Sequence, residues 1–121
     1  MEIKNYRDLI VWQKSVDLVI DCYAITRRYP DNEKFGLSSQ IQRAAVSISA
    51  NIAEGHSRQH TKEYLQHLSI AYGSLAELET LLHISNRLDY ISTSKMKPFS
   101  KQTSEIGRML NGLRSALKPD P

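Results

Sequence analysis

The sequence contains a single cysteine, Cys22, among its 121 residues. One cysteine excludes an internal disulfide, and chains without disulfides are typical of reducing compartments, so we expect a cytoplasmic protein. There is also no run of about 18 apolar residues, the length that a membrane-spanning helix needs, and the first eight residues lack the basic and apolar segments of a secretory signal. These absences predict a soluble protein with no membrane partner, folded as one domain over residues 1–121.

Strand signals are nearly absent as well. No alternating run of β-branched residues lies between turn residues, whereas apolar residues recur at spacings of three and four along the whole chain. The pattern predicts an all-α fold, an antiparallel up-down-up-down four-helix bundle, with helices over about residues 5–29, 32–54, 61–88 and 95–118. We expect Gly55 to end the second helix in a left-handed conformation and Pro98 to lie in the first turn of the fourth. The tail after residue 118 should be frayed.

A helical wheel assigns one apolar stripe of each predicted helix to the core. In the first helix the stripe is Leu9, Trp12, Val16, Val19, Ile20 and Tyr23, and in the second it is Leu37, Ile41, Ala44, Ala45, Ile48 and Ile52. The third helix contributes Tyr64, Leu65, Leu68, Tyr72, Leu75, Leu78 and Leu82, and the fourth contributes Phe99, Ile106, Leu110, Leu113 and Leu117.

The first and third helices carry a second apolar stripe, which a four-helix bundle has no partner to cover. Its residues are Val11, Leu18 and Ile25 in the first helix and Ile70, Leu81, Ile84 and Leu88 in the third. We therefore predict that these side chains form the interface of a homo-oligomer. The alternative is that they are isolated surface residues, which are common in folded proteins.

Signatures of catalysis and of metal binding are missing. No Gly-x-Ser-x-Gly elbow is present, the glycines are scattered, and the Glu-x-x-His spacing of di-iron bundles does not occur. Three histidines flank the turn between the second and third helices, namely His56, His60 and His67. A zinc or nickel site there is conceivable, but solvated polar residues near a loop are the simpler interpretation. We expect no enzymatic activity, no metal and no cofactor.

Glu54 and Glu77 are not interpreted as catalytic carboxylates, because each lies on a predicted helix with cationic or hydroxyl neighbours available. Arg43 and Glu54 share one stripe of the second helix, near Asn51. We interpret these four residues as a structural polar seam between helices or between subunits.

Positive charge is concentrated toward the C-terminal end, although the formal net charge is only +3. Lys97, Lys101 and Arg108 share the side of the fourth helix opposite its apolar stripe, and Arg58 and Lys62 add charge near the turn before the third. A row of cations on a rigid helix can follow a phosphate backbone, so these five residues are the predicted contacts to RNA or DNA. The alternative is a solvated basic face. With few aromatic residues available to stack on bases, we expect no base-specific recognition.

Three segments resemble those of a known bacterial family. They are FGLSSQIQRAAVSISANIAEG at residues 35–55, DLIVWQK at 8–14 and LSIAYGSLAELE at 68–79. On these segments the chain resembles the four-helix bundle proteins that are also called 23S rRNA intervening sequence proteins, over about residues 6–115.

That resemblance implies a small bundle that assembles into a homopentameric ring and has no assigned enzymatic activity. It also implies a relationship to the accessory variability determinant of diversity-generating retroelements, a basic pentamer that works with a reverse transcriptase. The expected partners are therefore the chain itself, RNA or DNA, and either a reverse transcriptase or a ribosomal component. In the alternative function, the protein would be a scaffold for such a partner without touching nucleic acid.

Overall fold

The computed structural model describes residues 4–117, which form four α-helices and two short 3-10 turns. The helices are α1 (Ile10–Thr26), α2 (Leu37–His56), α3 (Thr61–Arg87) and α4 (Thr93–Leu117), and the turns are η1 (Tyr6–Asp8) and η2 (Asp31–Glu33). No strand occurs within residues 4–117, which confirms the all-α prediction with four helices. None of these helices combines the length and the apolar character that crossing a membrane requires.

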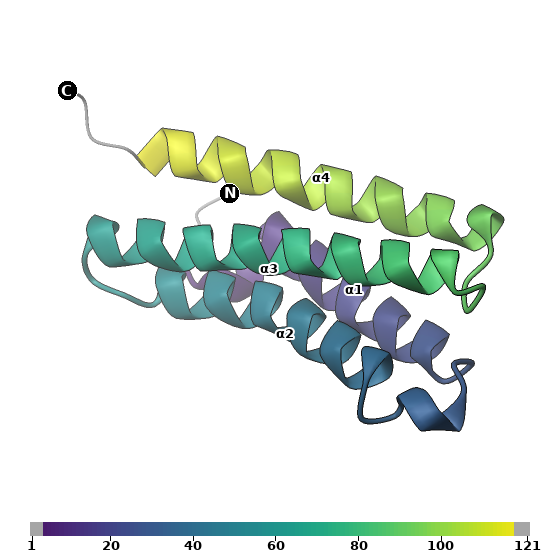
Figure 1. The fold of residues 1–121 in the computed structure, drawn as a ribbon. Helices are drawn as coiled ribbons and strands as arrows, with labels where there is room; N and C mark the ends of the chain where they lie inside the picture. Colours follow the sequence, from purple (N-terminus) through teal and green to yellow (C-terminus); the bar gives the residue numbers. More distant parts are fainter. Residues whose placement is uncertain (1–3, 118–121) are drawn as a thin grey trace.

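Each helix packs against two others. In Figure 1 the four helices lie alongside one another, and close backbone approaches join α1 to α2, α2 to α3, α3 to α4 and α4 to α1. The most extensive of these contacts is between α2 and α3. The four helices therefore surround a common core.

The first predicted helix, residues 5–29, is shorter in the structure because the chain is extended at Leu9. The Asn5 side chain accepts a hydrogen bond from the Arg7 amide, and the Asp8 carboxylate accepts one from the Asn5 amide, so these residues form a capping box around η1. Leu9 has a ψ of 123°, which is incompatible with a continuous helix. The α-helix therefore begins at Ile10.

Other predicted helix boundaries are wrong as well: α1 ends at Thr26 rather than at 29, and α2 begins at Leu37 rather than at 32, after η2. Gly55 lies inside α2 and has no positive φ; within residues 4–117 the left-handed φ, 64°, belongs to Asp89 in the connection from α3 to α4. The role of Gly55 is instead to allow close packing, because a Cβ there would lie 2.7 Å from the Cβ of His67 on α3. Pro98 lies in the second turn of α4 rather than the first. The predicted end of the fourth helix at residue 118 and the frayed tail lie outside the described residues.

The predicted core of α2, α3 and α4 is largely confirmed. The buried residues include Ile41, Ala44, Ala45, Ile48 and Ile52 of α2, Leu68, Leu75, Leu78 and Leu82 of α3, and Phe99, Ile106 and Leu110 of α4. Partly buried residues at its edge are Leu37, Tyr64, Leu113 and Leu117, and Leu65 is half-buried. The prediction is wrong for Tyr72, which is exposed.

The two apolar stripes of α1 are assigned the wrong way round by the sequence prediction. Val11, Leu18 and Ile25, predicted to face another subunit, are buried in the core of this chain together with Cys22. Among the residues predicted for the core, Ile20 is 62% exposed and Tyr23 is 39% exposed, while Leu9, Trp12, Val16 and Val19 are partly buried. Leu81 of α3 is also buried, so it too is unavailable as an outer contact.

The inward face of α1 contains polar residues that satisfy their own hydrogen bonds. The Ser15 hydroxyl donates to the Val11 carbonyl at 2.7 Å, and the Thr26 hydroxyl donates to the Cys22 carbonyl at 2.8 Å. A buried hydroxyl bonded in this way avoids most of the cost of leaving water. A helical wheel counts both residues as polar, and it therefore favours the bulkier apolar stripe on the other side.

Candidate nucleic-acid interface

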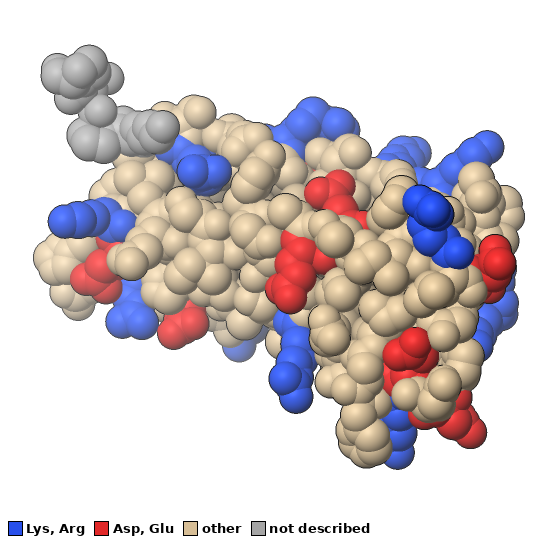
Figure 2. Space-filling view, in the orientation of Figure 1, with Lys and Arg blue, Asp and Glu red and all other residues tan. Residues whose placement is uncertain are grey.

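The predicted cationic row is present on the outer side of α4. Lys97, Lys101 and Arg108 are all exposed, whereas Phe99 and Ile106 of the same helix enter the core. Eleven residues of helix separate the ends of the row, which corresponds to about 16 Å along the axis. In Figure 2 several blue side chains lie along the upper edge of the molecule, over α4. The structure therefore places three cations on one rigid edge.

One carboxylate lies within this row. Glu105 accepts from Lys14 of α1, with a distance of 2.8 Å between Nζ and Oε1. The hydrogen bond and charge of Lys14 lower the pKa of Glu105, and the charges of Arg108 and Lys101 add to the effect. The row is therefore partly balanced by a glutamate that is ionised at neutral pH.

The other two predicted cations lie at a different place. Arg58 is 3.4 Å from the Glu54 carboxylate and 3.8 Å from that of Glu63, so its charge is shared with two acids, whereas Lys62 is exposed. The α2–α3 turn that carries them lies at the end of the molecule opposite the start of α4, where Lys97 is found (Figure 1). The five predicted residues therefore do not form one patch.

A second group of cations was not predicted as a site. Arg28 follows the last turn of α1, and Lys95 lies in the first turn of α4; both line one groove between these helices. Arg27 and Lys34 are exposed in the connection from α1 to α2. The Arg27-Arg28 pair was visible in the sequence, but its proximity to Lys95 depends on how α1 and α4 pack.

The side of the molecule seen in Figure 2 has no continuous basic surface. Blue side chains lie mainly around its edges, red side chains lie both at the edges and near the middle, and most of the remaining surface is neither basic nor acidic. On this side, blue side chains lie along the upper edge, over α4, and also along the lower edge, so positive charge is not confined to α4.

A polar seam does exist between α2 and α3, but its members differ from most of those predicted. The Ser47 and Ser74 hydroxyls are 2.8 Å apart, and Asn51 Nδ2 donates to the Ser47 carbonyl at 2.9 Å. Asn51 Oδ1 lies 3.0 Å from His67 Nδ1; since a carbonyl oxygen only accepts, that nitrogen donates. Of the predicted residues only Asn51 belongs to this seam.

The remaining predicted seam residues, Arg43, Glu54 and Glu77, are exposed on the outside of α2 and α3. Glu54 pairs with Arg58, which lies four residues later in the turn after α2. The prediction of a seam between helices of one chain is wrong for these three residues. Their place in contacts between subunits stays a prediction.

Three of the predicted interface residues are on the surface. Ile70, Ile84 and Leu88 of α3 are exposed. Ile20 and Tyr23 of α1 and Val46 of α2 are exposed as well, and the last two line one surface pocket. A second apolar face therefore exists on α1, but it is the face that the sequence assigned to the core.

The histidines near the α2–α3 turn have separate surroundings. The His56 ring packs edge-on against Tyr64 with 5.7 Å between centroids, His67 belongs to the polar seam, and His60 is exposed. Within residues 4–117, no three histidine, cysteine or acidic side chains are grouped as metal binding would require. Burial raises the pKa of the Cys22 thiol to about 12, so at neutral pH it is a poor nucleophile.

Comparisons with known proteins agree with the resemblance seen in the sequence. The family model for the 23S rRNA-intervening sequence protein matches residues 7–112. A solved structure from Bacteroides thetaiotaomicron, a protein with unknown function from the S23 ribosomal protein family, is similar with a TM-score of 0.78 and 26% identity. The similarity covers 87% of this chain and 98% of that one. The search of curated proteins finds no match. Because the family model covers most of its length, this chain belongs to the 23S rRNA-intervening sequence protein family.

Proposed function

We propose that this protein is a non-enzymatic homo-oligomer of the cytoplasm that binds the backbone of RNA or DNA. The observation that carries the proposal is the exposed row of Lys97, Lys101 and Arg108 on α4. In the described part of the chain, none of these three cations lies within salt-bridge distance of a carboxylate. Binding would release counterions from the phosphates, so affinity should fall steeply as salt concentration rises.

We also propose that the chain is an antiparallel up-down-up-down bundle. Two sets of contacts support this topology. Between α2 and α3, Ser47 is close to Ser74 and Asn51 is close to His67. Residue numbers therefore rise along α2 as they fall along α3, as in an antiparallel pair. Between α1 and α4, the pairs are Lys14 with Glu105 and Asp21 with Gln102, which also run in opposite directions.

The proposed assembly is a ring of such bundles, which the family resemblance makes a pentamer. Exposed apolar side chains on two sides of the chain support self-association, since a ring needs two contact faces on each protomer. One face would be Ile20 and Tyr23 of α1 with Val46 of α2, and the other would be Ile70, Ile84 and Leu88 of α3. Assembly would repeat the α4 row around the ring and strengthen its field.

Fluorescence anisotropy at low salt, with a structured RNA and a duplex DNA, tests the proposed activity. The variant Lys97→Glu, Lys101→Glu, Arg108→Glu should lose binding, because it reverses the row while leaving the core untouched. A matched control with Lys4, Arg7 and Arg87 changed to Glu alters the net charge equally, and all three positions are exposed elsewhere. Equal losses in both variants would mean that only net charge matters. No binding by the unaltered protein would exclude the proposal.

A second candidate function is a scaffold for a protein partner such as a reverse transcriptase or a ribosomal component. The observation that favours it is Phe35, which is 90% exposed and has the Lys34 ammonium 5.6 Å from its ring centroid. An aromatic side chain exposed to this degree, beside a cation, resembles the anchors found at protein interfaces. If nucleic acid does not bind at low salt, this candidate takes precedence.

A further inference from the structure

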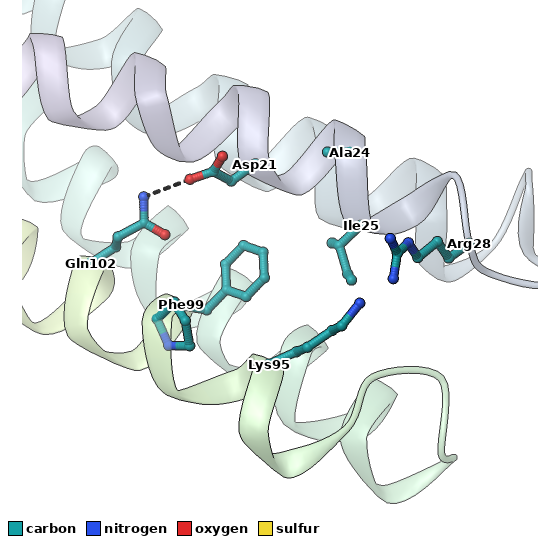
Figure 3. Close-up of a pocket in the computed structure, with 8 residues that line it drawn as sticks. Asp21, Ala24, Ile25, Arg28, Lys95, Phe99 and Gln102 are labelled. Atoms are coloured by element: carbon teal, nitrogen blue, oxygen red, sulfur yellow. Dashed lines mark hydrogen bonds between the residues drawn. The ribbon is translucent and has the colours of Figure 1, made fainter.

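A groove of about 380 Å³ lies between the last turns of α1 and the first turns of α4. Its apolar wall consists of Ala24, Ile25, Pro98 and Phe99, and its polar residues are Asp21, Arg28, Lys95 and Gln102. Figure 3 shows the Phe99 ring between the two helices, with Arg28 and Lys95 toward one end and Asp21 and Gln102 toward the other. The groove therefore has a cationic end, an apolar middle and a polar end.

The cationic end of the groove brings two positive charges together. In Figure 3 the charged ends of Arg28 and Lys95 point toward each other. Within residues 4–117, neither is in salt-bridge distance of a carboxylate. Two converging cations repel each other, and a bound anion would relieve that repulsion.

Helix stability does not explain this pair of charges. Arg28 follows the C-terminal end of α1, where a cation is favourable. Lys95, however, lies in the first turn of α4, where the helix dipole disfavours a cation and favours an anion. The position of Lys95 is therefore better suited to holding an anion between itself and Arg28.

The opposite end of the groove is polar and already organised. Gln102 Nε2 donates to the Asp21 carboxylate at 3.0 Å, which fixes both side chains at the edge of the Phe99 ring. Together they offer an amide and a carboxylate, which can both donate to and accept from a ligand. Arg28 follows Asp21 by seven residues and lies two residues beyond the end of α1, which corresponds to a separation of about 10 Å along the helix axis. A ligand with a phosphate at one end and a flat polar ring at the other matches this order.

We propose that the groove binds a nucleoside monophosphate unit. Arg28 and Lys95 hold its phosphate, the base lies against Phe99 and Pro98, and Gln102 and Asp21 contact the base edge. The choice of a nucleotide over another aromatic phosphate rests on the proposed nucleic-acid function. The groove adds to that function a pocket for one unpaired nucleotide, which the backbone contacts of the α4 row do not supply.

Isothermal titration of the full-length protein with adenosine monophosphate and with inorganic phosphate tests the site. Adenosine monophosphate should bind at least about tenfold more tightly than phosphate, because only the nucleotide uses the apolar wall. The variant Arg28→Ala, Lys95→Ala should weaken nucleotide binding by about tenfold or more, since it removes charge-assisted hydrogen bonds. A control with Lys4→Ala and Arg87→Ala, two exposed cations outside the groove, should bind as the unaltered protein does.

A second variant separates the groove from the charges. Ala24 is exposed and lines the groove, so Ala24→Gln should obstruct it while leaving both cations in place. This variant should lose the advantage of nucleotide over phosphate but keep the weak affinity for phosphate. Equal affinity of phosphate and nucleotide for the unaltered protein, or nucleotide binding unaffected by both variants, would overturn the proposal. Displacement of the nucleotide by octanoate at similar concentration would also overturn the proposal, because the groove would then bind any small molecule with an anionic end and an apolar end.

Polymeric ligands identify the source of the nucleotide and keep the two proposals distinct. If a single-stranded oligoadenylate competes with adenosine monophosphate and a duplex does not, the site takes a nucleotide from a strand. If only the free nucleotide binds, the site is for mononucleotides, and the groove stands even if the α4 row binds no nucleic acid. Duplex binding through the α4 row without any nucleotide binding would leave the proposed function intact and refute the groove.

Discussion

Replacing Gly55 by alanine should destabilise the protein, although alanine is the better helix former. An added Cβ would lie 2.7 Å from the His67 Cβ, 3.0 Å from the Tyr64 ring and 3.3 Å from the Tyr64 carbonyl oxygen. The closest of these atoms is fixed to the α3 backbone and cannot rotate away, so α2 and α3 must move apart. Overpacking of this kind costs about 1–3 kcal/mol. The higher helix propensity of alanine stabilises the folded state by no more than about 1 kcal/mol, so it does not offset this cost.

We therefore expect Gly55→Ala to lose about 2 kcal/mol, or roughly 5–10 °C in melting temperature for a chain of this size. The matched control is Gly73→Ala, the same change in the middle of α3, where an added Cβ has no neighbour within 4 Å. That variant should gain about 0.5–1 kcal/mol from helix propensity alone. Both substitutions replace glycine by alanine within a helix, but Gly55→Ala should lower the free energy of unfolding and Gly73→Ala should raise it.

Thermal and urea unfolding followed by circular dichroism measure both effects, at one fixed protein concentration because self-association would shift the midpoints. A second readout is the ring of His67, whose 3.0 Å hydrogen bond to Asn51 lies one turn from Gly55 and should weaken when the helices separate. The reasoning fails if Gly55→Ala is as stable as the unaltered protein, or if both alanine variants are destabilised to the same extent.

Three further outcomes follow from the buried and exposed groups. Burial raises the pKa of the Cys22 thiol from 9.0 to about 12, so above pH 9 the thiol ionises in the unfolded chain but not in the folded one. The free energy of unfolding should therefore fall as pH rises above 9, by up to about 1.4 kcal/mol per pH unit. The urea midpoint should drop between pH 8 and pH 10, and it should drop less in Cys22→Ala than in the unaltered protein. Within residues 4–117 the buried Tyr64 hydroxyl has no hydrogen-bond partner, so Tyr64→Phe should be neutral or stabilising by up to about 1 kcal/mol. A clear loss of stability in urea unfolding would contradict this prediction. Changing the exposed residues Ile84 and Leu88 to Glu should lower the mass seen in light scattering without unfolding the chain, and an unchanged mass would remove α3 from the proposed interface.

The sequence predicts α2 and its core face well because the helix has a single, unambiguous apolar stripe. Five of its six predicted core residues are buried, and the sixth, Leu37, is partly buried at the edge. Propensity, period and packing all favour the same face of this helix. The same is true of α4, where Phe99, Ile106 and Leu110 enter the core.

The sequence could not predict which face of α1 is buried, because both faces are apolar. The choice depends on Ser15 and Thr26, whose hydroxyls are satisfied by carbonyls of their own helix and so can be buried at little cost. A wheel that ranks residues by hydropathy alone assigns them to water. The boundary at Gly55 was missed for a related reason, since the glycine serves contact with His67 rather than a turn.

Some features of the candidate site follow from the spacing of residues along one helix, whereas others depend on how the helices pack. The row of Lys97, Lys101 and Arg108 follows from helical spacing alone, and the structure places it where the spacing predicts. The pairing of Arg58 with Glu54 and Glu63 needs the geometry of the α2–α3 turn. The groove formed by α1 and α4 needs the packing of two helices that are far apart in the chain.

The salt dependence of duplex DNA binding tests the central claim most directly. The logarithm of the association constant should fall linearly with the logarithm of salt concentration, with a slope of about −0.9 for each phosphate contacted. Replacing Lys97, Lys101 and Arg108 by Ala should make that slope shallower by up to about 2.7 for every α4 helix engaged, since three contacts are removed. The account predicts this loss of slope in the triple variant and none in the variant with Lys4, Arg7 and Arg87 changed to Ala. An affinity that is independent of salt, or a slope that the triple variant leaves unchanged, would contradict it.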